Sequence, residues 1–493
     1  MPFISKSKYL SGLQCKKLLW YQYNAKDRIP SVDASTQAIF DQGHEVGRLA
    51  QTLFPNGIEI DGDPKDFGAL FAQTNSALRE RRPVYEATFR FGEGFARLDI
   101  LNPVADGAWD IVEVKSSTEV KDVHIRDLAL QRYVTEGAGV PIRKCFLMRI
   151  DNQYVRRGAV DPAKLFVQED VTREVRDELA RVGPNLQEMS QVIRNAVSPE
   201  VPIGPQCSDP YECILQDLCW KFVPEDSPLS LYHFRKARAF ELVNSGVLSL
   251  DRLSSDEGLD KKQEIQVRAV TDGKPFVNQR EILTFVRKLE YPVYYLDFET
   301  LQTAIPLFDG IRPYQKVPFQ FSLHVEDAPG VPPQHFAYLS EGRIDPRPEV
   351  LEQLAQLLGK KGSIVSYNAA FERSVLSDAA AAFPAYRPWW EETVRRMVDL
   401  LEPFRGFSYY HPQQHGSASM KAILPAMTGK GYEELAIADG EAASREYLRV
   451  TFGEASEADR QGVREQLLEY CGLDTEGMIA IVRELMKLAN GGR

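Results

Sequence analysis

Apolar and polar residues follow two different periods along the first half of the chain. Residues 1–50 place apolar side chains close to the roughly 3.6-residue period of a helix. Residues 83–115 change to short β-rich runs, VYEATFRF, FARLDIL and WDIVEVK, which predict strands. Residues 122–137 and 170–200 predict helices, with a buried strand, KCFLMRI, between them. The pattern therefore predicts an α/β domain over residues 1–225.

The second half begins with a charged, mostly helical stretch without a recognisable catalytic motif, which predicts a connector over residues 226–287. From residue 291 the strand-like runs VYYLDFE, FQFSLHVE, HFAYL and SIVSYN are followed by helical patterns. The longest of these is REQLLEYCGLDTEGMIAIVRELMKL, near the C-terminus. We expect a second α/β domain over residues 288–493, and hence an α/β protein of two domains joined by a helical connector.

Composition and charge narrow the class of protein. Hydrophobic residues make up 43% and charged residues 26% of the 493 residues, which excludes disordered, collagen-like and coiled-coil chains. No run approaches the about 18 apolar residues of a membrane span, and the N-terminus lacks a secretory signal, so we expect a cytoplasmic protein with no membrane partner. The net charge of −11 argues against a protein that coats nucleic acid over its whole surface. A protein with this net charge can still bind nucleic acid through a local basic patch.

Two carboxylates and a lysine fall on neighbouring predicted strands. Asp99 lies in RLDIL, and Glu113 and Lys115 share one face of WDIVEVK because they are two residues apart. Converging carboxylates bind a hard cation such as Mg²⁺ or Mn²⁺, and a nearby lysine can position or activate water for attack on a phosphodiester. Glu86 and His44 are further candidates for this site. The alternative is a sheet whose solvent face carries ordinary charges.

Four of the six cysteines form a candidate sulfur-ligated centre. They are Cys15, Cys207, Cys213 and Cys219. Four thiolates suit either Zn²⁺ or a [4Fe–4S] cluster. The last three cysteines are separated by five residues each, wider than in zinc knuckles, which favours iron–sulfur. The alternative is a set of buried free thiols, which is also our interpretation of Cys145 and Cys471, in apolar stretches.

A second set of carboxylates follows the predicted strands of the C-terminal half. Asp297 and Glu299 lie on one face at the end of VYYLDFET. Glu372 begins a helix after SIVSYN, and Tyr470 and Asp474 are four apart on one helical face. Four carboxylates can hold two Mg²⁺ or Mn²⁺ ions for in-line displacement at phosphorus, with the tyrosine orienting the attacking water. The alternative is exposed strand-end acids and a tyrosine that only packs.

The order of features over about residues 1–222 resembles that of RecB-like PD-(D/E)XK nucleases with an iron–sulfur staple, including CRISPR-associated and exonuclease V-type members. The resemblance implies a restriction-endonuclease-like core, with one cysteine before it and three after it ligating the cluster. It further implies that His44, Asp99 and Glu113 bind metal and that Lys115 is catalytic.

Members of that family also carry a glutamine and a tyrosine on a helix after the lysine. In this chain DLALQRY offers Gln131 and Tyr133, whose spacing departs from the family pattern. Asp127 and Gln131 are four residues apart on one helical face, and they are the alternative candidates for the family's glutamine and tyrosine positions. All three are therefore supporting candidates.

Residues 290–488 resemble the DnaQ-like, RNase H-fold exonucleases with DEDD chemistry. LDFET matches the first motif, SYNAAFE the second, and Tyr470-x3-Asp474 the third in its tyrosine variant. The resemblance implies an exonuclease of the 3′–5′ type that uses Mg²⁺ or Mn²⁺. The second motif usually carries aspartate where this chain has Glu372, whose longer side chain can still ligate a metal. Asp399 is a secondary candidate.

The combination of both halves resembles an uncharacterised bacterial family of fused nucleases. It implies a metal-dependent nuclease with one site in each half, acting on DNA or RNA that is single-stranded or has free ends. The alternative function is a single-site exonuclease whose N-terminal half is an inactive iron–sulfur platform that binds nucleic acid. A scaffold with two decayed sites is a third reading. No G-x-x-x-x-G-K-[ST] motif occurs, so we expect no ATP-driven motor.

Overall fold

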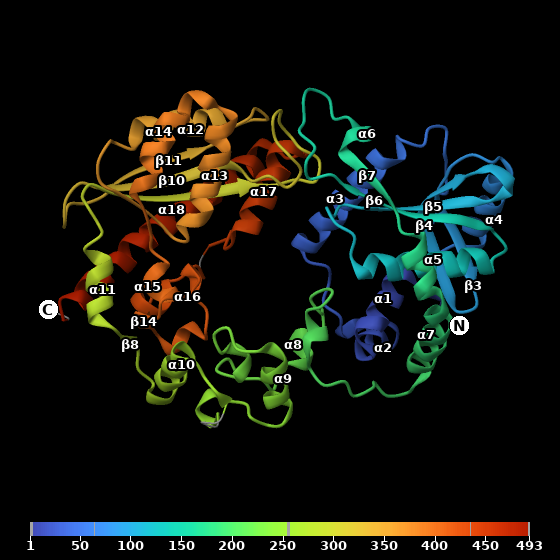
Figure 1. The fold of residues 1–493 in the computed structure, drawn as a ribbon, viewed down its shortest axis with the longest axis horizontal. Helices are drawn as coiled ribbons and strands as arrows, with labels where there is room; N and C mark the ends of the chain where they lie inside the picture. Colours follow the sequence, from blue (N-terminus) through green and yellow to red (C-terminus); the bar gives the residue numbers. More distant parts are fainter. Residues whose placement is uncertain (1–2, 64, 254–256, 434, 492–493) are drawn as a thin grey trace. The chain divides into compact units, whose positions relative to one another are not determined.

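The computed structural model describes residues 3–63, 65–253, 257–433 and 435–491. The chain divides into two compact units, whose elements are labelled in Figure 1. Unit 1 comprises Met1–Phe222 and Thr303–Tyr314, and unit 2 comprises Val223–Gln302 and Gln315–Arg493. Each unit combines a mixed sheet with helices, so the predicted α/β class is confirmed. The stretch expected to form a separate connector lies within unit 2.

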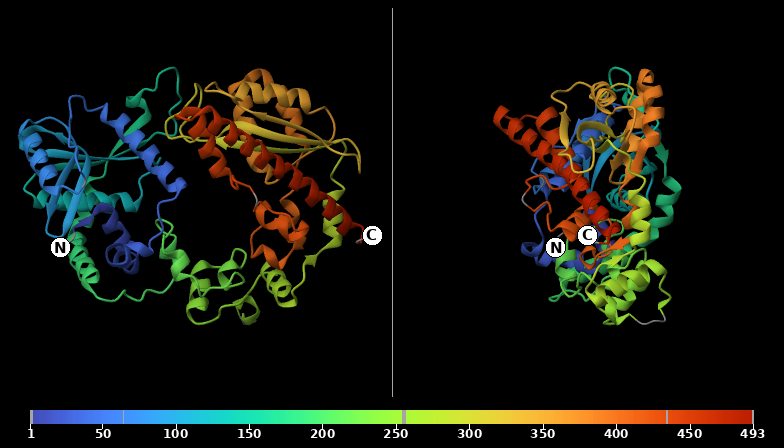
Figure 2. Two further views of the ribbon diagram at one scale, coloured as in Figure 1. Left: turned by 180° about the vertical axis from the view of Figure 1, so that it is seen from behind. Right: turned by 90° about the vertical axis from the view of Figure 1, so that its left-hand side faces the viewer.

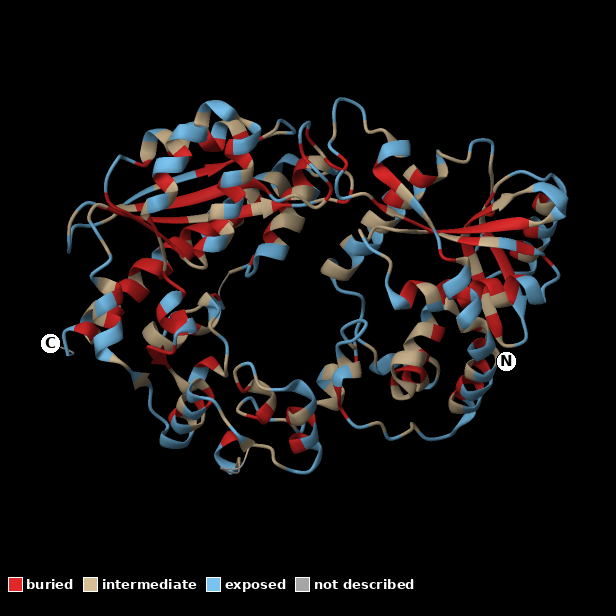
Figure 3. Cartoon of the chain, viewed as in Figure 1, coloured by how far each residue is buried: buried red, intermediate tan, exposed pale blue. Residues whose placement is uncertain are grey.

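Seven strands of unit 1, counted over the described residues, form one sheet in the order β2-β3-β4-β5-β6-β7, with β1 paired to β4. Strand β5 runs antiparallel to β4 and parallel to β6, and its first five residues are buried (Figure 3). Burial on both faces explains its nearly continuous apolar sequence. The strands are β1 (Ile4–Ser5), β2 (Ile58–Glu59), β3 (Val84–Phe91), β4 (Gly94–Pro103), β5 (Trp109–Lys115), β6 (Ile142–Ile150) and β7 (Phe166–Asp170).

Helices cover both faces of this sheet. Helices α5 and α7 pack against each other and share one apolar core with Ile111 of β5. Helix α3 packs on the opposite face, where Val46 shares a core with Val112. The helices are α1 (Lys6–Gln14), α2 (Lys16–Asn24), α3 (Ala34–Gln51), α4 (Phe67–Arg79), α5 (Asp122–Gly137), α6 (Pro162–Leu165), α7 (Thr172–Arg194) and α8 (Gln216–Cys219).

The segment Thr303–Tyr314 belongs to unit 1 although it follows the first strand of the second sheet. Ala304 is buried in the same apolar core as Val46. The guanidinium of Arg156 donates hydrogen bonds of 2.8 and 2.7 Å to the carbonyl oxygens of Pro306 and Leu307. These contacts fix the segment to unit 1, and nothing in its local sequence pattern predicts them.

The main sheet of unit 2, over the described residues, has five strands in the order β11-β10-β9-β12-β13. The inner strand β9 pairs antiparallel with β10 and parallel with β12. A separate small sheet pairs β8 with β14. The strands are β8 (Phe276–Val277), β9 (Val293–Leu301), β10 (Val317–Glu326), β11 (Gln334–Leu339), β12 (Ser363–Ser366), β13 (Met397–Asp399) and β14 (Tyr409–Tyr410).

The long helix α18 packs along β9 and β10, as the left view of Figure 2 shows. Helices α12 and α13 share an apolar core with Leu296 and Phe298 on the other face of β9. The helices are α9 (Lys236–Asn244), α10 (Lys261–Asp272), α11 (Gln279–Val286), α12 (Arg347–Leu357), α13 (Ala369–Ala382), α14 (Arg387–Thr393), α15 (Glu402–Arg405), α16 (Met420–Thr428), α17 (Gly440–Phe452) and α18 (Glu457–Ala489). In the described part of the chain, no helix is both long and apolar enough to cross a membrane.

Candidate active site

Strand β9 presents Asp297 and Glu299 on the face that lies under α18. Leu296 and Phe298 occupy the opposite face, as the two-residue period of a strand requires. Glu299 is 6% exposed, whereas Asp297 is partly exposed and is therefore accessible to solvent. The predicted pair of carboxylates thus lies on an inner strand of the sheet. At these two residues β9 is paired with β10, whereas its pairing with β12 ends at Tyr295.

Two further acids come to the same site from different helices. Glu372 lies in the first turn of α13 and is 2% exposed, and Asp474 lies in α18 and is 7% exposed. The negative charges of Glu372 and Asp474 both act on Asp297 and Glu299. The structure therefore brings together the four acids that the sequence proposed as metal ligands.

Burial and mutual repulsion raise the pKa values of these acids. Burial, followed by the charge of Asp474, raises the pKa of Glu299 to about 8. Burial raises the pKa of Glu372 to about 8 and that of Asp474 to about 6. The pKa of Asp297 is raised by burial and by the other three carboxylates. None of the four forms an ion pair with a basic side chain among the described residues, so no neighbouring ammonium or guanidinium group offsets their mutual repulsion at short range.

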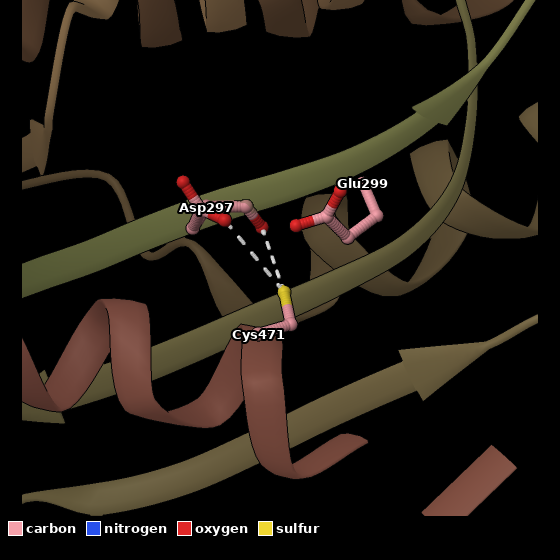
Figure 4. Close-up of side chains that lie close together, drawn as sticks. All are labelled: Asp297, Glu299 and Cys471. Carbon is pink, nitrogen blue, oxygen red and sulfur yellow. Dashed lines mark hydrogen bonds between the residues drawn. The ribbon is translucent and has the colours of Figure 1, made fainter. Parts of the chain in front are cut away.

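Two further side chains of helix α18, Tyr470 and Cys471, and one from the loop between α16 and α17, Tyr432, complete the site. The Tyr432 hydroxyl donates a 2.5 Å hydrogen bond to Asp474 Oδ1, and the Tyr470 hydroxyl also lowers the pKa of that acid. The thiol of Cys471 donates to Asp297 Oδ2 at 3.7 Å (Figure 4). Tyr432 is 42 residues from Asp474, so no sequence spacing indicated it. Cys471, which we interpreted only as a buried thiol, is indeed buried but contacts the site.

The secondary candidate Asp399 binds backbone amides at the turn before α13. Its Oδ1 accepts hydrogen bonds from the backbone amides of Asn368 and Leu401, both at 3.0 Å. Asn368 has a positive φ of 68° immediately before α13, a backbone region that is costly for most residues. Asp399 therefore holds the turn that positions Glu372, and its charge raises the pKa of Glu372.

The raised pKa values predict a pH-dependent stability of the metal-free protein. Glu299 and Glu372 keep protons in the folded state that the unfolded chain releases near pH 4. The folded state therefore loses stability as the pH rises from about 4 to about 8. We expect the melting temperature without metal to fall between pH 6 and pH 8, and added Mn²⁺ to raise it more at pH 8. Calorimetry of EDTA-treated protein measures both effects.

Two variants test the origin of this pH dependence of the melting temperature. Glu299→Gln removes one of the titrating groups, and the control Glu352→Gln changes an acid on the exposed side of α12. The first variant should show a weaker pH dependence than wild type and the second the same pH dependence. Equal Mn²⁺ shifts at both pH values in wild type contradict this prediction.

Unit 1 carries a second polar cluster, on β4, β5 and α5. Glu113 is fully buried, and the Lys115 ammonium lies 2.7 Å from Glu113 Oε1 and 2.9 Å from Asp127 Oδ2. The Gln131 amide donates to Glu113 Oε2 at 2.7 Å and to Asp127 Oδ1 at 3.0 Å. Asp99 Oδ2 accepts a 2.8 Å hydrogen bond from the backbone of β5. The structure thus brings together five residues that the sequence proposed for this site.

Lys6, at the start of α1, is the residue of this cluster that the sequence analysis missed. Its ammonium lies 2.9 Å from Glu113 Oε1 and 3.4 Å from Asp99 Oδ1. Burial and the charge of Asp99 act to raise the pKa of Glu113, but Lys115 and Lys6 lower it. A lysine thus supplies the positive charge between the two acids that were expected to hold a metal.

The remaining candidates of unit 1 lie apart from this cluster or at its edge. His44 is exposed on α3, and the described contacts do not join it to the acids. Tyr133 packs against Phe91, with ring centroids 5.4 Å apart. Glu86 pairs with Arg97 at 2.7 Å, and burial together with Asp99 raises its pKa to about 7.

The four cysteines proposed as sulfur ligands come together in unit 1. Cys15, Cys213 and Cys219 pack around one small apolar cluster, and Cys207 lies within electrostatic reach of Cys15 and Cys213. All four are free thiols. The Gln14 amide holds the cysteine loop by hydrogen bonds of 2.9 and 2.6 Å to the carbonyl oxygens of Gln206 and Tyr211. The structure therefore places the four predicted cysteine ligands near one another in unit 1.

Comparison with known proteins gives limited matches. Residues 294–419, about a quarter of the chain, match a family model described as a domain of unknown function, DUF2779. An uncharacterized protein of Mycoplasma pneumoniae, the MG366 homolog, is 25% identical over 234 residues, which covers 44% of this chain and 35% of that protein. The chain thus spans about a third of the length of this curated relative. The matched domain contains Asp297, Glu299 and Glu372 but ends before Asp474.

Proposed function

We propose that this protein is a metal-dependent nuclease whose active site is the carboxylate cluster of unit 2. The observation that carries the proposal is the set of four mutually repelling carboxylates, three of them buried and Asp297 partly exposed, that form no ion pair with a basic side chain among the described residues. Such a site favours divalent cations of the Mg²⁺ class, which bind through oxygen ligands. Asp297, Glu299, Glu372 and Asp474 would hold the ions, which when bound stabilise negative charge at a reacting phosphodiester.

The chain's own residues supply the remaining functions of a hydrolytic site. The Tyr470 hydroxyl would orient a water molecule; its contact with Asp474 on the same face of α18 supports this role. The Tyr432 hydrogen bond holds the Asp474 carboxylate in one orientation. The exposed lysines Lys316 and Lys421 act electrostatically on the carboxylates and provide positive charge for a polyanionic strand.

The experiment that tests the proposal is cleavage of end-labelled single-stranded DNA and RNA with Mn²⁺ or Mg²⁺. We expect metal-dependent release of nucleotides from a strand end, abolished by EDTA and by Glu372→Gln. The matched control Glu352→Gln changes an exposed acid of the same unit and should keep the wild-type rate. Wild-type protein that cleaves neither strand with either metal contradicts the proposal.

A second nuclease site in unit 1 is the other candidate function. It is favoured by the convergence of Asp99, Glu113 and Lys115, with Asp127 and Gln131 completing the cluster. A metal ion between Asp99 and Glu113 has to displace the ammonium of Lys6. This requirement makes the unit 1 cluster the weaker candidate, and an inactive platform that binds nucleic acid is its alternative role.

We further propose that the four cysteines of unit 1 bind a [4Fe–4S] cluster. Four thiolates suit either Zn²⁺ or a [4Fe–4S] cluster. Cys207, Cys213 and Cys219 are separated by five residues each, which is wider than in zinc knuckles and favours the iron–sulfur core over a single zinc ion.

Protein purified without oxygen should therefore be brown and contain about four iron atoms per chain, because iron–sulfur centres are coloured. Cys213→Ser should lose most of the iron, whereas Cys145→Ala, which alters a buried thiol in β6, should retain it. Iron analysis and the visible spectrum measure this. A colourless protein with stoichiometric zinc contradicts the iron assignment.

A further inference from the structure

Cys471 offers the unit 2 site a sulfur donor that the proposed hydrolysis does not use. The residue is fully buried on α18, and its side chain is directed to the strand that carries Asp297 and Glu299 (Figure 4). One ligand atom from each of these three residues lies within 4.8 Å of the others. This is the one such group of three or more ligand-type side chains among the described residues.

The separation of the donors fits a tetrahedral ion. Zn²⁺ binds sulfur at about 2.3 Å and carboxylate oxygen at about 2.1 Å, so a tetrahedral angle places these two donors about 3.6 Å apart. The Cys471 sulfur lies 3.7 Å from Asp297 Oδ2. The two donors therefore need almost no rearrangement to share one ion.

A second observation indicates that the site lacks a positive partner. Glu372 is 2% exposed, and its Oε2 atom is buried without a hydrogen-bond partner. The charge of Glu372 acts on Asp297 and Glu299, so this unpartnered oxygen belongs to the same site. A buried acceptor of this kind is costly unless a cation or donor reaches it.

We propose that Asp297, Glu299 and Cys471 form a binding site for a thiophilic divalent cation of the Zn²⁺ class. Thiolate sulfur is a soft ligand that favours Zn²⁺ over Mg²⁺, whereas the carboxylates accept either. On binding, the Cys471 thiol releases its proton to solvent as the metal–sulfur bond forms, and no electron is transferred. The inference rests on the proposed function in one respect: the ion occupies carboxylates of the hydrolytic site and inhibits the Mg²⁺- or Mn²⁺-dependent reaction.

Cobalt provides a spectroscopic probe for this site in the full-length protein. Co²⁺ bound to a thiolate gives a sulfur-to-metal charge-transfer band, and the cysteines of unit 1 supply a background common to the variants. Wild type and Cys145→Ala should show about one more thiolate-bound Co²⁺ per chain than Cys471→Ser. They should also release more protons per chain on binding, at least the one that the Cys471 thiol loses, with further protons from the carboxyl groups whose pKa values are raised. Identical Co²⁺ titrations of wild type and Cys471→Ser overturn the proposal.

A second variant keeps the test decisive if Cys471→Ser does not fold. Glu299→Gln retains the thiol and removes one carboxylate, and should weaken Co²⁺ binding at this site by at least about tenfold. Unchanged affinity in this variant overturns the proposal as well. Nucleic acid is absent from these titrations, so they are independent of cleavage. A cobalt band without nuclease activity refutes the proposed function alone, and nuclease activity without the band refutes this inference alone.

Discussion

Replacing Asp297 with asparagine is expected to lower metal-dependent cleavage by at least about a thousandfold, while the metal-free protein becomes more stable. Loss of a metal ligand removes several kcal/mol of transition-state stabilisation, and each 1.36 kcal/mol corresponds to about tenfold in rate. The gain in stability follows because Asp297 is repelled by Asp474, Glu299 and Glu372. Single-turnover cleavage and calorimetric melting of EDTA-treated protein measure the two effects.

A lower cleavage rate together with a higher melting temperature would show that Asp297 serves catalysis and does not stabilise the fold. Glu469→Gln changes an exposed acid of α18 next to Tyr470 and should alter neither quantity appreciably. If Asp297→Asn lowered both the rate and the melting temperature, the four acids would be contributing to the fold instead of repelling one another.

Replacing Glu113 with glutamine should strongly destabilise unit 1. The buried Glu113 carboxylate accepts from Lys6, Lys115 and Gln131, so its loss leaves two partly buried ammonium groups with one negative partner fewer. Removing one member of a buried ion-pair network typically costs about 3–5 kcal/mol. Hydrogen exchange of the β5 amides reports the free energy of opening in this unit, and we expect their protection to fall accordingly.

The matched control is Glu119→Gln, which alters an exposed acid shortly after β5 and should leave the exchange unchanged. A double variant that also replaces Lys6 with methionine should cost less than the sum of the two single changes, because the residues are in contact. Strictly additive costs, or normal protection in Glu113→Gln, contradict the network.

The two clusters differ in how their negative charge is balanced. In unit 1, Lys6 and Lys115 lie within ion-pair distance of the acids and lower the pKa of Glu113. In unit 2 the acids have no such partner among the described residues, and the pKa values of Glu299 and Glu372 are raised to about 8. This difference is the physical reason for assigning metal-dependent chemistry first to unit 2.

Local sequence pattern predicted the parts of both clusters that depend on a single element. The two-residue spacing of Asp297 and Glu299 places them on one face of β9, and the four-residue spacing of Tyr470 and Asp474 places them on one face of α18. The α/β class followed from the change of period along the chain. These features are encoded by neighbouring residues, so one sequence is sufficient to find them.

Contacts between distant segments were not predictable in the same way. Lys6 reaches Glu113 across 107 residues, and Tyr432 reaches Asp474 across 42. Residues 303–314 join unit 1 through tertiary contacts, such as those of Arg156, that leave no periodic signal. Such pairings are set by packing of the whole unit, which local spacing does not encode.

The most direct test of the central claim compares four proteins on end-labelled single-stranded DNA and RNA with Mn²⁺: wild type, Asp297→Asn, Lys115→Met and the double variant. We predict that Asp297→Asn loses the ladder of products shortened from a strand end, and that Lys115→Met keeps it. Products that persist in Asp297→Asn and vanish in the double variant would assign a second activity to unit 1. A wild-type ladder and rate from Asp297→Asn would contradict the assignment of the active site to unit 2.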